Sequence, residues 1–189
     1  MVLTLLLGGA RCGKSALAID LARGREGLPV TFLATAEPVD REIAERIDRH
    51  RAERPGDWET LEEPIELERA LGGPTDGVVV VDCLTLWVSN MLGRRFDDVT
   101  VLQRAAHFAT RAHERPGPVI VVSNEVGSGI VPADALSRRY RDALGRVNAT
   151  FAARSDEAFL VVAGRVLALS RPVTPSSPVA PDVRRRPSS

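Results

Sequence analysis

Residues 8–15 read Gly8-Gly9-Ala10-Arg11-Cys12-Gly13-Lys14-Ser15. The stretch matches the pattern G-x-x-x-x-G-K-[ST] without a mismatch, and it stands between an apolar run and a helical pattern. Gly8 and Gly13 allow backbone conformations that a Cβ atom would obstruct, so successive N–H groups can turn toward phosphate oxygens. The N-terminus of the following helix adds its positive dipole. We therefore predict that all eight residues bind a nucleotide.

Three side chains in or near this loop carry specific chemistry. Lys14 is the only lysine of the chain, and its ammonium group can reach the outer phosphates. The Ser15 hydroxyl can bind Mg²⁺. Asp82 ends the apolar run Val78–Val81, and an acid at the carboxyl end of a buried parallel strand lies on the ligand side of the sheet. We expect Asp82 to hold Mg²⁺ directly or through water; the alternative is an acid that caps the next segment.

Apolar runs alternate with amphipathic stretches along the chain. The runs predict strands at Val2–Leu7, Val30–Ala34, Val78–Val81, Val119–Val122, Ala158–Val162 and Val166–Leu169. The amphipathic stretches predict helices at Lys14–Arg23, Asp40–Arg54, Leu84–Leu92, Val99–Glu114 and Ala133–Arg154. Such alternation is typical of an α/β fold of the P-loop NTPase type, with a mostly parallel central sheet flanked by helices. We expect one domain over residues 1–170 and a flexible, Pro-, Ser- and Arg-rich tail over residues 171–189.

Composition narrows the class of protein. The chain has 189 residues, of which 44% are hydrophobic and 26% charged, and its formal net charge is zero. No overall field attracts nucleic acid or anionic lipid, so neither is an expected partner. The run Val2–Leu7 is too short to span a bilayer, and Cys12 and Cys83 form no CxxC pair. We expect a reduced cytoplasmic protein.

The position of the only lysine excludes one class of nucleotide-binding protein. Switch GTPases read guanine with an Asn-Lys-x-Asp motif, which this chain cannot form because Lys14 lies in the loop. A small-molecule kinase or a nucleotidyltransferase remains. Helical spacing within Asp40–Arg54 puts Glu42, Arg46, His50 and Arg54 on one stripe, which is either an anion-binding face or a solvated face with a Glu42–Arg46 pair.

From about Leu5 to Leu169 the sequence resembles the bifunctional adenosylcobinamide kinase/adenosylcobinamide-phosphate guanylyltransferases. The motifs that carry the resemblance stand in order along the chain: Gly8–Ser15, Ala34–Ala36, Arg46-Ile47 with His50, Arg54-Pro55, Trp58, Val81–Trp87, Ser123–Pro132, Arg138, Tyr140–Asp142, Gly145 and Asn148. Two positions depart from the family pattern, since Cys12 replaces a usual serine and Ala149 a common glutamine.

The resemblance implies two reactions. ATP or GTP phosphorylates adenosylcobinamide, and GMP is then transferred from GTP to that phosphate through a histidine-bound GMP. His50 occupies the position of that histidine, with Lys14 as a second catalytic residue. Besides the phosphate loop, the resemblance implies that GTP is bound by Ala34, Thr35, Ala36, Arg51, Ala52, Glu53, Arg54, Glu62 and Asp82.

The resemblance leaves other roles open. Asn124 and Glu125 follow a predicted strand at the edge that carries the phosphate loop, so they bind either the corrinoid or the metal. Arg138 and Arg141 meet a substrate phosphate or a neighbouring subunit. Some family members form homotrimers, so we expect a homo-oligomer. The alternatives are another P-loop small-molecule kinase without guanylyltransferase activity, and a nucleotide-dependent binding module.

Overall fold

The computed structural model describes residues 2–38 and 41–171, apart from the side chains of residues 41–43 and 46. Its strands are β1 (Leu3–Gly8), β2 (Val30–Ala34), β3 (Glu59–Glu62), β4 (Val78–Asp82), β5 (Val119–Val122), β6 (Glu157–Val162) and β7 (Arg165–Ala168). Its helices are α1 (Lys14–Arg23), α2 (Arg41–Ala52), the 3₁₀ helix η1 (Leu67–Gly72), α3 (Leu84–Gly93), α4 (Asp98–Glu114) and α5 (Ala135–Arg154). The tail predicted over 171–189 lies outside the described residues except for Arg171.

The strands form one sheet in the order β3-β2-β4-β5-β1-β6-β7. Every pair is parallel except β6–β7, which is an antiparallel hairpin. The predicted mostly parallel α/β fold is therefore confirmed. β1, β2 and β5 are buried along their whole length, which explains why their sequences read as continuous apolar runs.

The predicted elements end within two residues of the observed ones, and two elements were not predicted. β3 was missed because Glu59–Glu62 is mostly exposed and has no apolar run. η1 was missed because it is only six residues long. The helix predicted over Asp40–Arg54 ends at Ala52, so the prediction that Arg54 continues the helical stripe of His50 is wrong.

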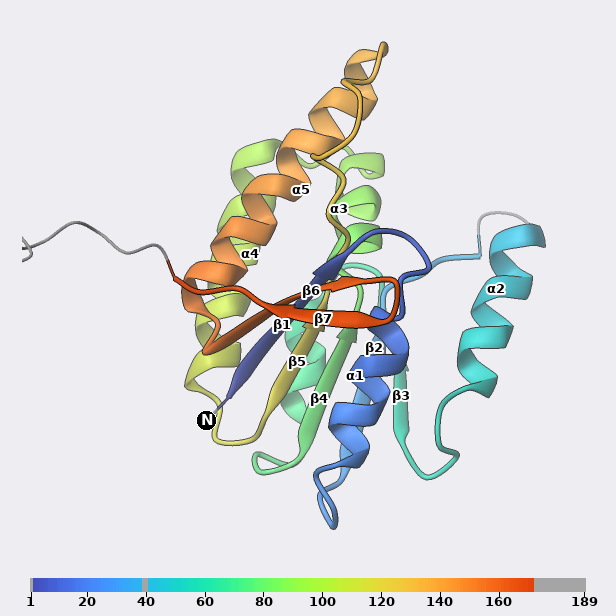
Figure 1. Ribbon diagram of the computed structural model, residues 1–189, viewed down its shortest axis with the longest axis vertical. Coiled ribbons are helices and arrows are strands. Elements are labelled where there is room, and N and C mark those ends of the chain that lie inside the picture. The colour runs from blue at the N-terminus through green and yellow to red at the C-terminus, as the bar shows by residue number, and fades with distance from the viewer. Residues whose placement is uncertain (1, 39–40, 172–189) are drawn as a thin grey trace, which may run out of the picture.

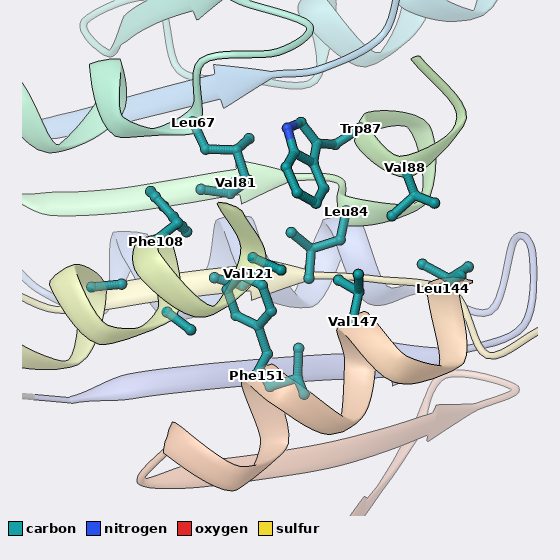
Figure 2. Close-up of a cluster of buried hydrophobic side chains, with 14 of the residues drawn as sticks. Leu67, Val81, Leu84, Trp87, Val88, Phe108, Val121, Leu144, Val147 and Phe151 are labelled. Atoms are coloured by element: carbon teal, nitrogen blue, oxygen red, sulfur yellow. The ribbon is translucent and has the colours of Figure 1, made fainter. Parts of the chain in front are cut away.

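Helices cover both faces of the sheet (Figure 1). One face packs against α1, and its apolar cluster includes Phe32, Val80 and Val122. The other face packs against η1, α3, α4 and α5, in the larger cluster drawn in Figure 2. There the rings of Phe108 and Phe151 lie 6.0 Å apart between centroids, joining α4 to α5.

Helix α2 stands beside the edge of the sheet that ends in β3 (Figure 1). Because β1 to β6 run parallel, their carboxyl ends meet at one edge, where Gly8, Ala34, Asp82 and Val122 lie. Ligands of open α/β sheets bind at this edge. No helix in the described ranges is both long and apolar enough to cross a bilayer.

Candidate active site

The phosphate loop joins β1 to α1 at the carboxyl edge of the sheet. A Cβ atom on Gly8 would overlap the carbonyl oxygen of Val161, so only glycine fits there. Gly13 precedes α1 with φ 103°, and Arg11 also has a positive φ of 55°. These conformations curl the backbone around the position where a phosphate binds in loops of this pattern.

The turn of the β6–β7 hairpin packs on the same loop. The Gly164 N–H donates a hydrogen bond to the Cys12 carbonyl, with 3.0 Å between N and O. In a trans peptide the C=O and the following N–H point in opposite directions, so this bond turns the Gly13 N–H away from the hairpin. Sequence reasoning missed this contact; the available signal was Gly164 between two apolar runs.

Lys14 and Ser15 begin the helix after the loop, and Asp82 ends β4 at the same edge of the sheet. Lys14 is 6% exposed, and its Nζ lies 2.5 Å from the Gly9 carbonyl oxygen and 3.5 Å from the Cys12 sulfur. Ser15 and Asp82 are half-buried, and neither side chain has a hydrogen-bond partner in the described part of the chain. Oxygen ligands of this kind, completed by phosphate and water, suit Mg²⁺. Among the described residues no cluster of three or more His, Cys, Asp or Glu offers another metal site.

Arg54 leaves the end of α2 and turns toward the sheet. Its guanidinium carbon lies 4.0 Å from the centroid of the Phe32 ring, and its Nε and Nη1 are buried without a partner in the described structure. Burial lowers the pKa of Arg54, while the charge of Asp82 opposes that shift. Buried donors without partners are costly, and a phosphate oxygen would satisfy them.

Arg51 joins α2 to β3. It forms an ion pair with Glu62, which raises the pKa of Arg51, and it lies 3.3 Å from an Asp48 carboxylate oxygen. Glu62 was expected to help bind GTP, and its carboxylate accepts a hydrogen bond from Arg51 in this structure. The pair therefore links the last turn of α2 to the end of β3.

His50 points its Nδ1 at the carboxylate of Glu53, the first residue after α2. Nδ1 lies 3.3 Å from Glu53 Oε2, and the imidazole is 38% exposed. A carboxylate beside one ring nitrogen favours the proton there, which leaves the lone pair on Nε2. The side chains of Glu42 and Arg46, predicted to share the stripe of His50, lie outside the described residues. The i, i+3 spacing of His50 and Glu53 was the sequence signal for the observed pair.

The segment Ala34–Ala36 follows β2. Ala34 is buried and Ala36 is half-buried. The Thr35 hydroxyl donates to the Cys83 carbonyl at 2.7 Å and accepts from the Cys83 N–H at 2.8 Å, so it ties β2 to the end of β4. Thr35 thus shapes the site through the backbone, and its hydroxyl proton is already used in the bond to Cys83.

The remaining candidates occupy the segment after β5 and the start of α5. The Glu125 N–H donates to the Gly8 carbonyl at 3.1 Å, which brings this segment against the phosphate loop. Arg138 donates to the carbonyls of the preceding loop, and Arg141 to Asp142. Ala52 ends α2 and is exposed. The structure therefore brings Asn124 and Glu125 to the loop, whereas the two arginines contact their own neighbours.

Comparison with known proteins agrees with this site. Residues 4–169 match the family model described as cobinamide kinase/cobinamide phosphate guanyltransferase. The chain is 45% identical over 164 residues to the bifunctional adenosylcobalamin biosynthesis protein CobP of Pseudomonas aeruginosa, a match that covers 85% of this chain and 92% of that one. It is 37% identical over 177 residues to the bifunctional adenosylcobalamin biosynthesis protein CobU of Salmonella typhimurium, covering 86% and 97%.

A solved structure supports the fold independently. A protein of Pyrococcus horikoshii OT3 superposes with a TM-score of 0.52 at 7% identity, covering 88% of this chain and 85% of that one. An identity this low supports the fold alone, whereas the family match extends over most of the sequence. The chain belongs to the cobinamide kinase/cobinamide phosphate guanyltransferase family.

Proposed function

We propose that guanylyl transfer by this enzyme passes through a GMP bound covalently to His50. As a family member the chain is a kinase and guanylyltransferase of cobalamin biosynthesis. The kinase reaction places the γ-phosphate of ATP or GTP on the aminopropanol hydroxyl of adenosylcobinamide. The transferase reaction places GMP from GTP on that phosphate and yields adenosylcobinamide-GDP.

The contact between His50 and Glu53 carries this proposal. With the proton on Nδ1, the Nε2 lone pair of a neutral imidazole is free to attack the α-phosphorus of GTP. The bond from Nε2 to the α-phosphorus forms as the bond from that phosphorus to the bridging oxygen breaks, and pyrophosphate leaves. An oxygen of adenosylcobinamide phosphate then attacks the same phosphorus and releases the imidazole.

Cationic groups around the site support the displacement. Lys14 lies in the phosphate loop, and Arg54 offers two buried N–H donors beside Asp82. Both suit the charge that develops on pyrophosphate. Mg²⁺, when held by Ser15 and Asp82, would neutralise further phosphate charge. We also assign Arg51 to the phosphates, and Glu125 to the corrinoid or the metal.

Incubation with α-labelled GTP tests the intermediate. The wild-type protein should acquire an acid-labile, alkali-stable label, and His50→Ala should acquire none. His107→Ala is a matched control because His107 is an exposed histidine of α4. If the wild type stays unlabelled but still phosphorylates adenosylcobinamide, the chain is a small-molecule kinase with His50 as a phosphate-side residue.

A homo-oligomer, a trimer by family resemblance, is the second part of the proposal. The loop before α5 and the first turn of that helix expose Ile130 (97%), Val131 (60%) and Leu136 (65%). Clustered apolar side chains with such exposure mark contact surfaces. Light scattering of the wild type and of Ile130→Asp should give a trimer and a smaller species respectively. A cytoplasmic location remains a prediction from the sequence.

A further inference from the structure

The tip of β5 lies between the two strands that carry the phosphate-binding groups. In the sheet β5 has β1, which leads into the phosphate loop, on one side and β4, which ends in Asp82, on the other (Figure 1). Asp82 pairs in register with Val122, and so does Leu6. The first residues after β5 therefore stand between Gly8 and Asp82.

Strand alternation decides which of these residues faces the nucleotide. Ile120 and Val122 belong to the cluster on the α1 face, whereas Val119 and Val121 belong to the cluster on the opposite face. Ser123 continues the second set, since its hydroxyl donates to Asn148 of α5 at 2.7 Å. The parallel ladder continues past β5, because the Ser123 and Glu125 N–H groups donate to the carbonyls of Leu6 and Gly8. The next side chain in the alternation is therefore directed to the α1 face, which also holds the phosphate loop and, by the same alternation along β4, Asp82.

That next residue is Asn124, and its backbone is held from both sides. Its N–H donates to Thr85 Oγ1 at 2.7 Å, and its carbonyl accepts from Asn148 Nδ2 at 2.9 Å. The following N–H, of Glu125, donates to the Gly8 carbonyl. The Asn124 carboxamide itself is half-exposed and has no hydrogen-bond partner in the described ranges. A rigid backbone thus presents an uncommitted amide beside the phosphate loop.

We propose that the Asn124 carboxamide contacts the γ-phosphate of the donor nucleotide and thereby serves the kinase reaction rather than guanylyl transfer. The inference rests on the proposed function of the site. A neutral amide can donate N–H to a phosphate oxygen without competing with Mg²⁺ for charge. In the kinase step the acceptor oxygen bonds to the γ-phosphorus, the bond from that phosphorus to the β-phosphate oxygen breaks, the hydroxyl proton passes to water, and nucleoside diphosphate leaves. In guanylyl transfer the γ-phosphate departs within pyrophosphate without reacting.

This difference between the reactions gives a test with two arms on one protein. In Asn124→Ala, kcat of adenosylcobinamide phosphorylation should fall at least about tenfold, as expected when one donor to a developing charge is lost. At saturating GTP, kcat of GMP transfer onto preformed adenosylcobinamide phosphate should stay within about threefold of the wild type. Ser128→Ala is the control, because Ser128 is an exposed residue of the same loop. An equal loss in both reactions, or no loss in the kinase reaction, would overturn the inference.

A binding measurement separates a phosphate contact from a defect of folding. The affinity of Asn124→Ala for the β,γ-imido analogue of GTP should fall by roughly tenfold, while its affinity for GDP stays that of the wild type. Equal weakening of both ligands would also overturn the inference. Failure of the wild type to form a histidine-bound GMP would remove the proposed intermediate but leave the kinase arm and the binding ratio as valid readouts of Asn124.

Discussion

The guanidinium carbon of Arg54 lies 4.0 Å from the centroid of the Phe32 ring, which places a cation against the α1 face of the sheet close to Asp82. Two of its nitrogens are buried and unpartnered within the described structure. Leaving such donors unpaired costs free energy of unfolding that a bound phosphate can restore. Phosphate binding, more than stability of the fold, explains an arginine at position 54.

Arg54→Met should therefore separate affinity from stability. GTP affinity should fall on the order of tenfold to a hundredfold, because charge-assisted hydrogen bonds to phosphate are lost. The free energy of unfolding without nucleotide should stay the same or rise, because two buried N–H donors without partners are removed. Calorimetric titration and urea unfolding measure the two quantities. A variant that binds GTP normally but unfolds more easily would show that Arg54 is a structural residue.

Gly8→Ala and Gly9→Ala form a matched pair for the phosphate loop. A Cβ atom on Gly8 would overlap the carbonyl oxygen of Val161, whereas one on Gly9 meets nothing within 4 Å. Gly8→Ala should abolish measurable GTP binding or destabilise the protein by about 1–3 kcal/mol, as overpacking does. Gly9→Ala should keep GTP affinity within a fewfold of the wild type. Equal tolerance of the two substitutions would contradict the close approach of β6 to the loop.

Alkylation should distinguish the two cysteines. Cys12 is a half-buried residue of the phosphate loop. Cys83 keeps some exposed area as a residue, but burial of its thiol raises the pKa of that group to about 11, so little thiolate forms at pH 8. Iodoacetamide at pH 8 should label Cys12 first and inactivate both reactions, and GTP should protect. Cys12→Ser should resist inactivation by iodoacetamide. If iodoacetamide inactivates this variant as fast as the wild type, another residue reacts.

Tyr140 predicts how stability depends on alkaline pH. Burial first, and the Cys83 charge second, raise the pKa of its phenol from 10.0 to about 12. The folded protein then keeps a proton that the unfolded chain loses, so this contribution to stability is complete below pH 10 and is lost as pH rises toward 12. Tyr140→Phe should flatten that fall, although it loses the hydrogen bond to the Thr85 carbonyl. Urea unfolding of both proteins at pH 8 and pH 11 measures how far the free energy of unfolding falls. An equal fall in the wild type and in Tyr140→Phe would contradict the assigned pKa shift.

Much of the fold could be predicted because its signals are local. The phosphate loop and the buried strands β1, β2, β4 and β5 are contiguous patterns whose spacing alone predicts their conformation. Glu59–Glu62 gave no such signal, because β3 owes its conformation to pairing with β2 rather than to its own sequence. The 3₁₀ helix η1 also gave no signal, because six residues are too few to show a helical period.

The candidate site was predicted by residue type but not by geometry. Contacts such as Gly164 with Cys12, or Ser123 with Asn148, join residues far apart in the sequence, and periodicity carries no information about them. The end of α2 at Ala52 could not be predicted from the sequence either. Arg54 contacts Phe32, which is distant in the sequence, and no local pattern indicates this contact. The contact between His50 and Glu53 could have been predicted, because the two residues are three positions apart in the sequence.

The most direct test of the account is to locate the GMP adduct in the chain. After incubation with GTP, peptide mass spectrometry under alkaline conditions should find GMP on the peptide that contains His50, with fragments that assign it to the imidazole. Lys14 is the informative competitor, because a lysine can form the same class of phosphorus–nitrogen bond. An adduct on His50 alone is the predicted result. An adduct on Lys14, or none while adenosylcobinamide-GDP still forms, would contradict the account.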